Sequence, residues 1–143
     1  MLQREVAERL TAAPGGKAYG LLSVAAQLWA DLTPCFTVPA TAFSPPPKVE
    51  SAVIRIVFRQ APKVPLPDEA AFFKIVKAAF GQRRKNLVNA LRGGLGLTVP
   101  AVQRLLKAAG IDPSRRGESL SLEDFARLSH FFLQMAESRV LRY

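Results

Sequence analysis

The sequence predicts an α/β region followed by a small all-α region. Three observations support this division. Helical periodicity and short β-branched runs alternate over residues 1–60. Three prolines in the eight residues Gln60–Pro67 then indicate a linker, which we place at residues 61–67. After this linker, residues 68–143 show helical periodicity alone.

The N-terminal part predicts two helices and two strands. Apolar residues at helical spacing indicate helices over Gln3–Ala12 and Tyr19–Asp31, the second closed by Pro34. The run Cys35–Val38 predicts a strand, and Ser51–Phe58 predicts another that is covered on both faces. Two strands alone make a marginal sheet. We therefore expect this part to be the end of a larger α/β domain.

Four helices with short connections are predicted after the linker, as in a small bundle. Asp68, Thr98 and Ser121 are predicted to cap the first, third and fourth, because short polar side chains accept hydrogen bonds from helix N–H groups. The second helix is predicted over Asn86–Leu91. The pair Gly93-Gly94 is expected to end it.

Positive charge is concentrated in the C-terminal part of a chain whose formal net charge is +9. Residues 61–143 carry fourteen Lys and Arg against seven Asp and Glu, and Lys74–Arg116 contains ten basic residues and one acid, Asp112. Such clustering indicates a polyanionic partner, most often nucleic acid. An anionic membrane surface is the alternative, but the basic residues lie in short, glycine-broken segments rather than in one amphipathic helix.

The basic residues give a set of predicted phosphate contacts. A run between two predicted helices and a pair after the third could form two contact points. A solvated helix face is the alternative, and the scarcity of acids argues against it. The predicted RNA-binding residues are Lys48, Lys74, Lys77, Arg83, Arg84, Lys85, Arg92, Arg115 and Arg116.

Few residues could support catalysis or hold a metal. Cys35 and His130 are the only cysteine and histidine, so neither a disulfide nor a zinc site can be built from them. A lone cysteine, a charged N-terminus and no apolar run beyond Ala18–Ala30 indicate a soluble cytoplasmic protein. We expect a monomer with no metal and no membrane partner.

The stretch Phe43–Ile56 contains a proline elbow, which we define as residues 43–50. The prolines Pro45–Pro47 cannot join a helix or a sheet ladder and favour a stiff, extended segment. This segment carries Phe43 and Lys48 just ahead of a predicted strand. The pattern alone favours a surface turn with Phe43 packed underneath.

Two longer stretches resemble a known family. V-P-A-T-A-F-S-P-P-P-K-V-E-S-A-V-I-R-I and A-F-G-Q-R-R-K-N-L-V-N-A-L are similar to the ribosomal RNA adenine N6,N6-dimethyltransferases, especially those of the small subunit. The opening M-L-Q-R-E-V-A-E-R-L and the later R-R-G-E-S-L-S-L-E-D-F-A-R-L fit the same family in the same order. The resemblance implies methyl transfer from S-adenosylmethionine to two adjacent adenines of small-subunit rRNA. It also implies that residues 1–60 end a Rossmann-like methyltransferase domain and that residues 68–143 form a helical rRNA-binding domain.

The family's cofactor-binding and catalytic motifs do not occur in this sequence. These are a glycine-rich loop after the first strand, an acid after the second, and Asn-Leu-Pro-Tyr. We therefore expect a C-terminal portion that contains no cofactor-binding residue and is inactive alone. One site residue carries over: the resemblance implies that Phe43 stacks on the flipped target adenine.

Two alternatives to the enzyme fragment stay open from the sequence. One is a non-catalytic RNA- or DNA-binding module that uses only the basic helical part. The other is a chain that folds incompletely because its strands expose apolar faces.

Overall fold

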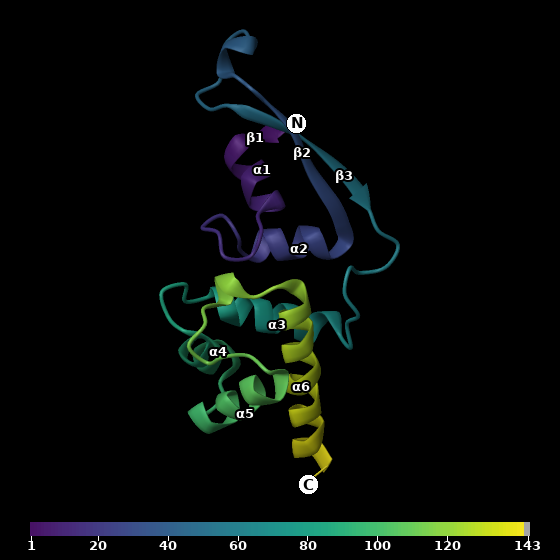
Figure 1. Ribbon diagram of the computed structural model, residues 1–143, viewed down its shortest axis with the longest axis vertical. Helices are drawn as coiled ribbons and strands as arrows, with labels where there is room; N and C mark the ends of the chain where they lie inside the picture. Colours follow the sequence, from purple (N-terminus) through teal and green to yellow (C-terminus); the bar gives the residue numbers. More distant parts are fainter. Residues whose placement is uncertain (142–143) are drawn as a thin grey trace. The chain divides into compact units, whose positions relative to one another are not determined.

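The computed structural model describes the backbone of residues 1–141 and the side chains up to residue 138. The chain divides into two compact units, Met1–Lys63 and Val64–Tyr143 (Figure 1). The first contains all three strands and the second contains helices only. The predicted α/β character of the chain is thus confirmed.

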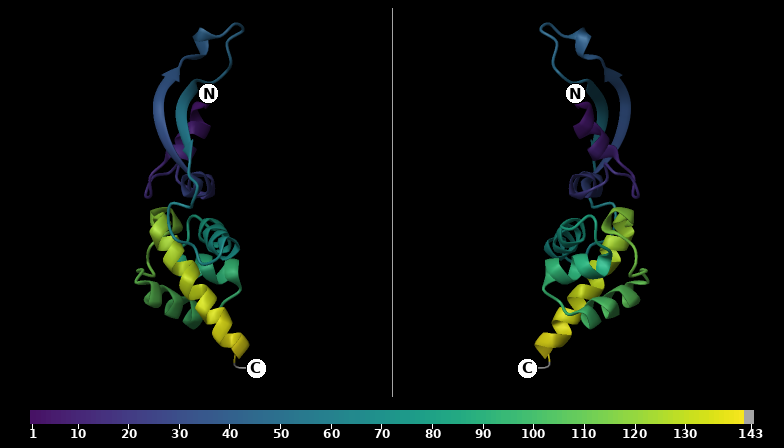
Figure 2. Two further views of the ribbon diagram at one scale, coloured as in Figure 1. Left: turned by 90° about the vertical axis from the view of Figure 1, so that its right-hand side faces the viewer. Right: turned by 90° about the vertical axis from the view of Figure 1, so that its left-hand side faces the viewer.

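The first unit is built on a three-stranded antiparallel sheet. Its order is β1 (Leu2–Gln3), β3 (Ser51–Phe58) and β2 (Ala30–Val38), so the longest pairing joins β2 to β3. Helix α1 (Arg4–Thr11) contacts both β2 and β3, and α2 (Leu21–Trp29) contacts α1 and β2 (Figure 2).

Strand β2 begins earlier than the sequence predicted. The predicted helix ended at Asp31 and was closed by Pro34, but Ala30 pairs with Phe58 and Pro34 with Ile54. Pro34 is accommodated because β2 is an edge strand and its register shifts between Pro34 and Phe36. Pairing with a distant strand therefore overrides the local helical pattern.

Strand β3 has the predicted bounds but not the predicted cover. Its last three residues, Ile56, Val57 and Phe58, are exposed, and Phe58 reaches 80%. The prediction that apolar residues on both faces are buried is therefore wrong for this half of the strand, among the residues that the structure describes.

The proline elbow belongs to neither a helix nor a strand, as predicted. It follows the short 3-10 helix η1 (Ala40–Ala42) and leads into β3. The peptide bond between Ser44 and Pro45 is cis. The elbow joins β2 to β3 in the first unit (Figure 1).

The second unit contains four helices and one short 3-10 helix. The helices are α3 (Glu69–Phe80), α4 (Leu87–Leu95), α5 (Val99–Ala109) and α6 (Leu122–Leu141), with η2 (Gly117–Ser119) between the last two. Their apolar faces form one core, in which each fully buried large side chain contributes about 1.5–3 kcal/mol. Its largest buried members are Phe72, Ile75, Val76, Leu87, Leu91, Val102, Leu105, Leu106, Leu120, Phe125 and Leu128.

The predicted helix caps are confirmed. The Asp68 carboxylate accepts from the Ala71 N–H at 3.1 Å, and the Thr98 hydroxyl accepts from Ala101 at 3.3 Å. Ser121 and Asp124 form a reciprocal capping box at the start of α6. These caps define where the helices begin.

Helix α4 runs through the glycine pair that was expected to end it. It continues to Leu95, and Gly96 closes it in the left-handed conformation with φ 65°. Gly94 is required by packing, since a Cβ there would lie 2.6 Å from the Ala78 Cα of α3. Close contact between two helices, rather than local propensity, therefore sets this boundary.

Candidate nucleic-acid interface

Two basic segments that are distant in sequence meet in the second unit. The N–H of Leu87, the first residue of α4, donates to the Arg115 carbonyl at 2.8 Å. This bond satisfies an N–H that has no partner within its own helix. It joins the turn before α4 to the loop before α6, and we call the residues that it brings together the basic corner. They are Arg83, Arg84, Lys85, Arg115 and Arg116.

A glycine holds the second segment close to α3. Gly117 is buried, and a Cβ at this position would lie 2.7 Å from the carbonyl oxygen of Ala79. Only a residue without a side chain permits this approach. Gly117 therefore fixes the depth at which Arg115 and Arg116 lie against the helices.

Four of the five cationic side chains of the basic corner are exposed: Arg83, Arg84, Lys85 and Arg116. The Arg83 guanidinium lies 6.0 Å from the centroid of the Phe80 ring, within the range of a cation–π interaction. Phe80 in turn packs on the buried Phe125, with ring centroids 5.9 Å apart. Arg83 thus contacts a ring that packs on the core, while its charged group is exposed at the surface.

Arg115 differs from the other members because its side chain turns inward. Its Nε donates to the Ser119 hydroxyl at 3.1 Å, and one Nη donates to the Ser119 carbonyl at 2.7 Å. The same Nη lies 3.5 Å from the Asp124 carboxylate. No sequence pattern indicated these partners, which lie four and nine residues further on.

Asp112, the one acid within Lys74–Arg116, stabilises the loop between α5 and α6. The Asp112 carboxylate accepts from both the N–H and the hydroxyl of Ser114, each at 2.8 Å. These hydrogen bonds, with a smaller contribution from Arg115, hold the pKa of Asp112 below its ordinary value. The sequence Asp112-Pro113-Ser114 is typical of such a turn, so this turn could have been predicted from the sequence.

The other predicted contacts lie outside the basic corner. Lys74 and Lys77 are exposed on α3, and the Lys74 Nζ lies 5.7 Å from the Phe132 ring centroid. Arg92 is exposed in the last turn of α4. Lys48 is exposed in the first unit, on the proline elbow.

The elbow presents Phe43 half-buried rather than fully packed. Its N–H donates to the Ala40 carbonyl at 3.2 Å, closing η1. Arg4 anchors the far end of the elbow twice: its N–H donates to the Glu50 carbonyl at 3.0 Å, and its guanidinium pairs with the Glu50 carboxylate at 2.9 Å. Hydrogen bonds to Glu8 and Glu50 raise the pKa of Arg4.

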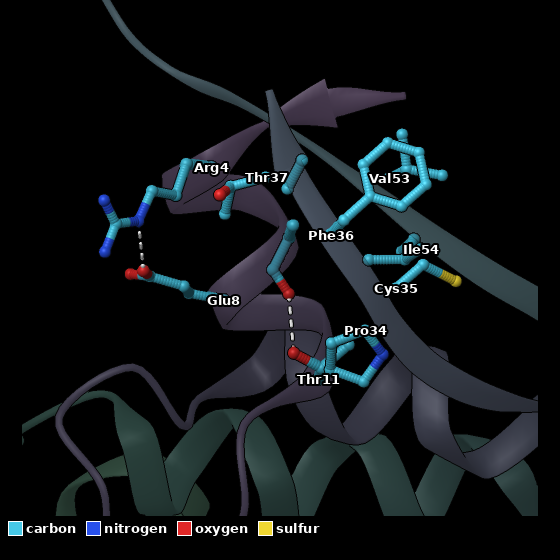
Figure 3. Close-up of a pocket in the computed structure, with 11 residues that line it drawn as sticks. Arg4, Glu8, Thr11, Pro34, Cys35, Phe36, Thr37, Val53 and Ile54 are labelled. Atoms are coloured by element: carbon cyan, nitrogen blue, oxygen red, sulfur yellow. Dashed lines mark hydrogen bonds and ion pairs between the residues drawn. The ribbon is translucent and has the colours of Figure 1, made fainter. Parts of the chain in front are cut away.

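A groove of about 260 Å³ lies between α1 and the sheet of the first unit. Figure 3 shows Arg4 and Glu8 paired at one side and the ring of Phe36 at the other. Phe36 pairs with Val53 across the strands and is 61% exposed. The walls are mostly apolar side chains from α1, β2 and β3.

This groove does not fit S-adenosylmethionine. A methyl-donor site of the expected kind needs a glycine-rich loop and a carboxylate available for the cofactor's hydroxyl groups. The one carboxylate that lines the groove, Glu8, is ion-paired with Arg4. Within residues 1–141, no three His, Cys, Asp or Glu side chains are grouped to hold a metal ion. No helix in the described part of the chain is long and apolar enough to cross a membrane.

Comparison with known proteins decides the family. The model of the family described as ribosomal RNA adenine dimethylase matches residues 1–134. The chain belongs to this family. The family predicted from the sequence motifs is thus confirmed.

Curated relatives of the dimethylase family align with most of this chain. "Ribosomal RNA small subunit methyltransferase A" of Pelotomaculum thermopropionicum is 53% identical over 134 residues, which are 93% of this chain and 45% of that protein. The protein of the same name from Geobacillus kaustophilus is 51% identical over 91% of this chain and 45% of its own length. The chain thus spans about half the length of these relatives.

Two solved structures share the fold of this dimethylase-family chain. A dimethyladenosine transferase from Plasmodium falciparum superposes with a TM-score of 0.77 and 21% identity, over 92% of this chain and 55% of that one. The 23S rRNA methyltransferase ErmE superposes with a TM-score of 0.59 and 22% identity, over 90% and 51% respectively. At these identities, the superpositions support a common fold.

Proposed function

We propose that the protein acts in the N6-dimethylation of two adjacent adenines in small-subunit rRNA, with S-adenosylmethionine as the methyl donor. The observation that carries this proposal is the hydrogen bond between Leu87 and Arg115, which assembles a basic corner in a chain of the dimethylase family. The partner is the small ribosomal subunit, and the protein is a cytoplasmic monomer. The relatives' printed names support the substrate class.

Within this function, the two units have different roles. Residues 1–60 are the end of a Rossmann-like methyltransferase domain, residues 61–67 a linker, and residues 68–143 a helical rRNA-binding domain. The division of the structure after Lys63 supports this assignment. The basic corner docks on RNA phosphates, with Lys74, Lys77 and Arg92 as further contacts.

Phe43 provides one face of the target-base site. A half-buried ring at the start of a fixed elbow is held in place and still has surface for a base to cover. Stacking of a base on an aromatic ring contributes about 1–3 kcal/mol, which offsets part of the cost of extruding an adenine. Lys48, on the same elbow, contacts the phosphate of the extruded nucleotide.

The chain alone does not transfer methyl groups. Its groove does not fit the methyl donor, and no step is assigned to the residues around it. The test is an assay with tritiated S-adenosylmethionine and unmethylated small subunits, for which we expect RNA binding without incorporation. Incorporation above a control without protein would contradict this statement.

A comparison of binding affinities separates the enzyme from a general nucleic-acid-binding module. A chain that docks on small-subunit rRNA should bind its adenine-bearing hairpin in preference to duplex DNA of equal length at the same salt concentration. Equal affinity for both would favour the non-catalytic module.

A further inference from the structure

The side chain of Arg115 is directed into the protein, although its sequence context suggests a phosphate contact. Its guanidinium makes two hydrogen bonds to Ser119 and faces the carboxylate of Asp124. The side chain is 35% exposed and that of Asp124 13%. A guanidinium whose donors are used internally has fewer left for RNA.

Asp124 connects Arg115 to the start of α6. One carboxylate oxygen accepts from the Ser121 N–H at 3.0 Å, and the other accepts from Arg127 at 2.5 Å. Arg127 also donates to the Ala109 carbonyl at the end of α5. The Arg115 side chain is therefore attached to a polar cluster that joins α5, α6 and the loop between them.

The backbone of Arg115 connects to the other half of the basic corner. Its carbonyl accepts from Leu87, two residues after Lys85. One residue thus contacts α4 through its backbone and the α6 cluster through its side chain. Displacing Arg115 would move the turn Arg83–Lys85 relative to Arg116.

We propose that Arg115 is a positioning residue that holds the two segments of the basic corner in register and does not itself contact phosphate. This inference rests on the proposed function of the corner as an RNA-docking site. It refines the prediction from sequence, which assigned Arg115 and Arg116 the same role. Of the pair, Arg116 is the RNA contact, and Arg115 holds Arg116 in register with the turn Arg83–Lys85.

Substitution of Arg115 by lysine distinguishes a positioning role of this residue from a role of its charge. Lysine keeps the positive charge but lacks the planar fork that reaches Ser119 and Asp124 together. Arg115→Lys should therefore weaken binding of an adenine-bearing hairpin of small-subunit rRNA by about threefold to tenfold. Arg116→Lys, the matched control, should change it by less than about twofold, because a lysine still neutralises a phosphate.

A double-mutant cycle distinguishes positioning from general destabilisation. In the background R83Q/R84Q/K85Q, where the turn has no charge left to position, Arg115→Lys should change RNA affinity by less than about twofold at low salt. An equal loss in both backgrounds would overturn the inference, and so would no loss in the unsubstituted chain. If R83Q/R84Q/K85Q itself leaves RNA binding unchanged, the proposed docking role fails, and the inference fails with it.

Amide exchange tests the positioning step without RNA. The Leu87 amide should exchange faster in Arg115→Lys than in Arg116→Lys, while the amide of the buried Val76 in α3 exchanges equally in both. Unchanged exchange at Leu87 would overturn the inference even if RNA affinity fell.

Discussion

The two units differ in how completely they bury their large apolar side chains. In the second, Phe72, Leu105 and Phe125 are fully buried in a core formed by its helices. In the first, Phe36 and Phe58 remain largely exposed on paired strands. The comparison indicates that the second unit closes its own core and the first does not.

The largest expected effect tests this contrast in stability. Phe125→Ala should lower the free energy of unfolding by about 3–5 kcal/mol. The ring packs against Phe72 and Phe80, so its removal leaves a cavity in the core. Phe58→Ala, at an exposed ring, should change it by less than about 0.5 kcal/mol. Urea unfolding followed by far-UV circular dichroism measures both.

If Phe125→Ala prevents folding altogether, Leu105→Ala provides a second variant of the same core, with an expected loss of about 2–5 kcal/mol. Equal losses for the core and the exposed residue would contradict the contrast between the units.

The next effect concerns charge within the second unit. Arg84→Gln with Lys85→Gln should weaken RNA binding about tenfold at low salt and reduce the slope of log affinity against log salt by about 1.5–2, since two phosphate contacts are lost. The matched control is Arg104→Gln with Lys107→Gln, two exposed cations of α5 that lie outside the basic corner. Filter binding over a salt series measures the slopes.

Equal slopes for the two double variants would show that net charge alone governs binding. In that case the position of the basic corner would have no role.

Local signals were sufficient for the helix starts of the second unit, but not for the end of α4 or for the strands of the first unit. Asp68, Thr98 and Ser121 were predicted as caps because a cap depends on residues only three positions away. Strand β2 could not be bounded from sequence, because Ala30 and Pro34 are held by partners twenty or more residues distant. The prediction that Gly93-Gly94 ends α4 was wrong for the same reason, since the contact of Gly94 with Ala78 is tertiary.

The candidate site shows the same limit. The sequence predicted which side chains are basic, but only the fold brings Arg115 beside Leu87 and turns its guanidinium toward Asp124. The roles of Arg115 and Arg116 therefore could not be separated from sequence. The role proposed for Phe43 came from family motifs, and no spacing or charge pattern indicated it.

A smaller effect is expected for Phe43 in the first unit. Phe43→Ala should weaken binding of the adenine-bearing hairpin about fivefold, near the lower end of the value of a base–aromatic stack. Phe36→Ala is the matched control, because it removes an exposed ring of the same unit that no adenine is proposed to contact. Fluorescence of 2-aminopurine at the target position measures stacking directly. The same loss in both variants would mean that a general apolar surface, not the elbow, holds the base.

The smallest expected effect is a pH dependence at Asp112. Because its hydrogen bonds to Ser114 lower the pKa in the folded state, the unfolded chain binds more protons in the acid range. The stabilisation is therefore complete above the unfolded value of about 3.9 and is lost as the pH falls through the folded value. Asp112→Asn keeps an oxygen that can accept from Ser114 but cannot ionise. The difference in urea midpoint between the two proteins should be constant from pH 7 to 5 and shrink between pH 4 and 2. A difference that grows on acidification would mean that the carboxylate is protonated more readily in the folded protein, contrary to its place in the loop.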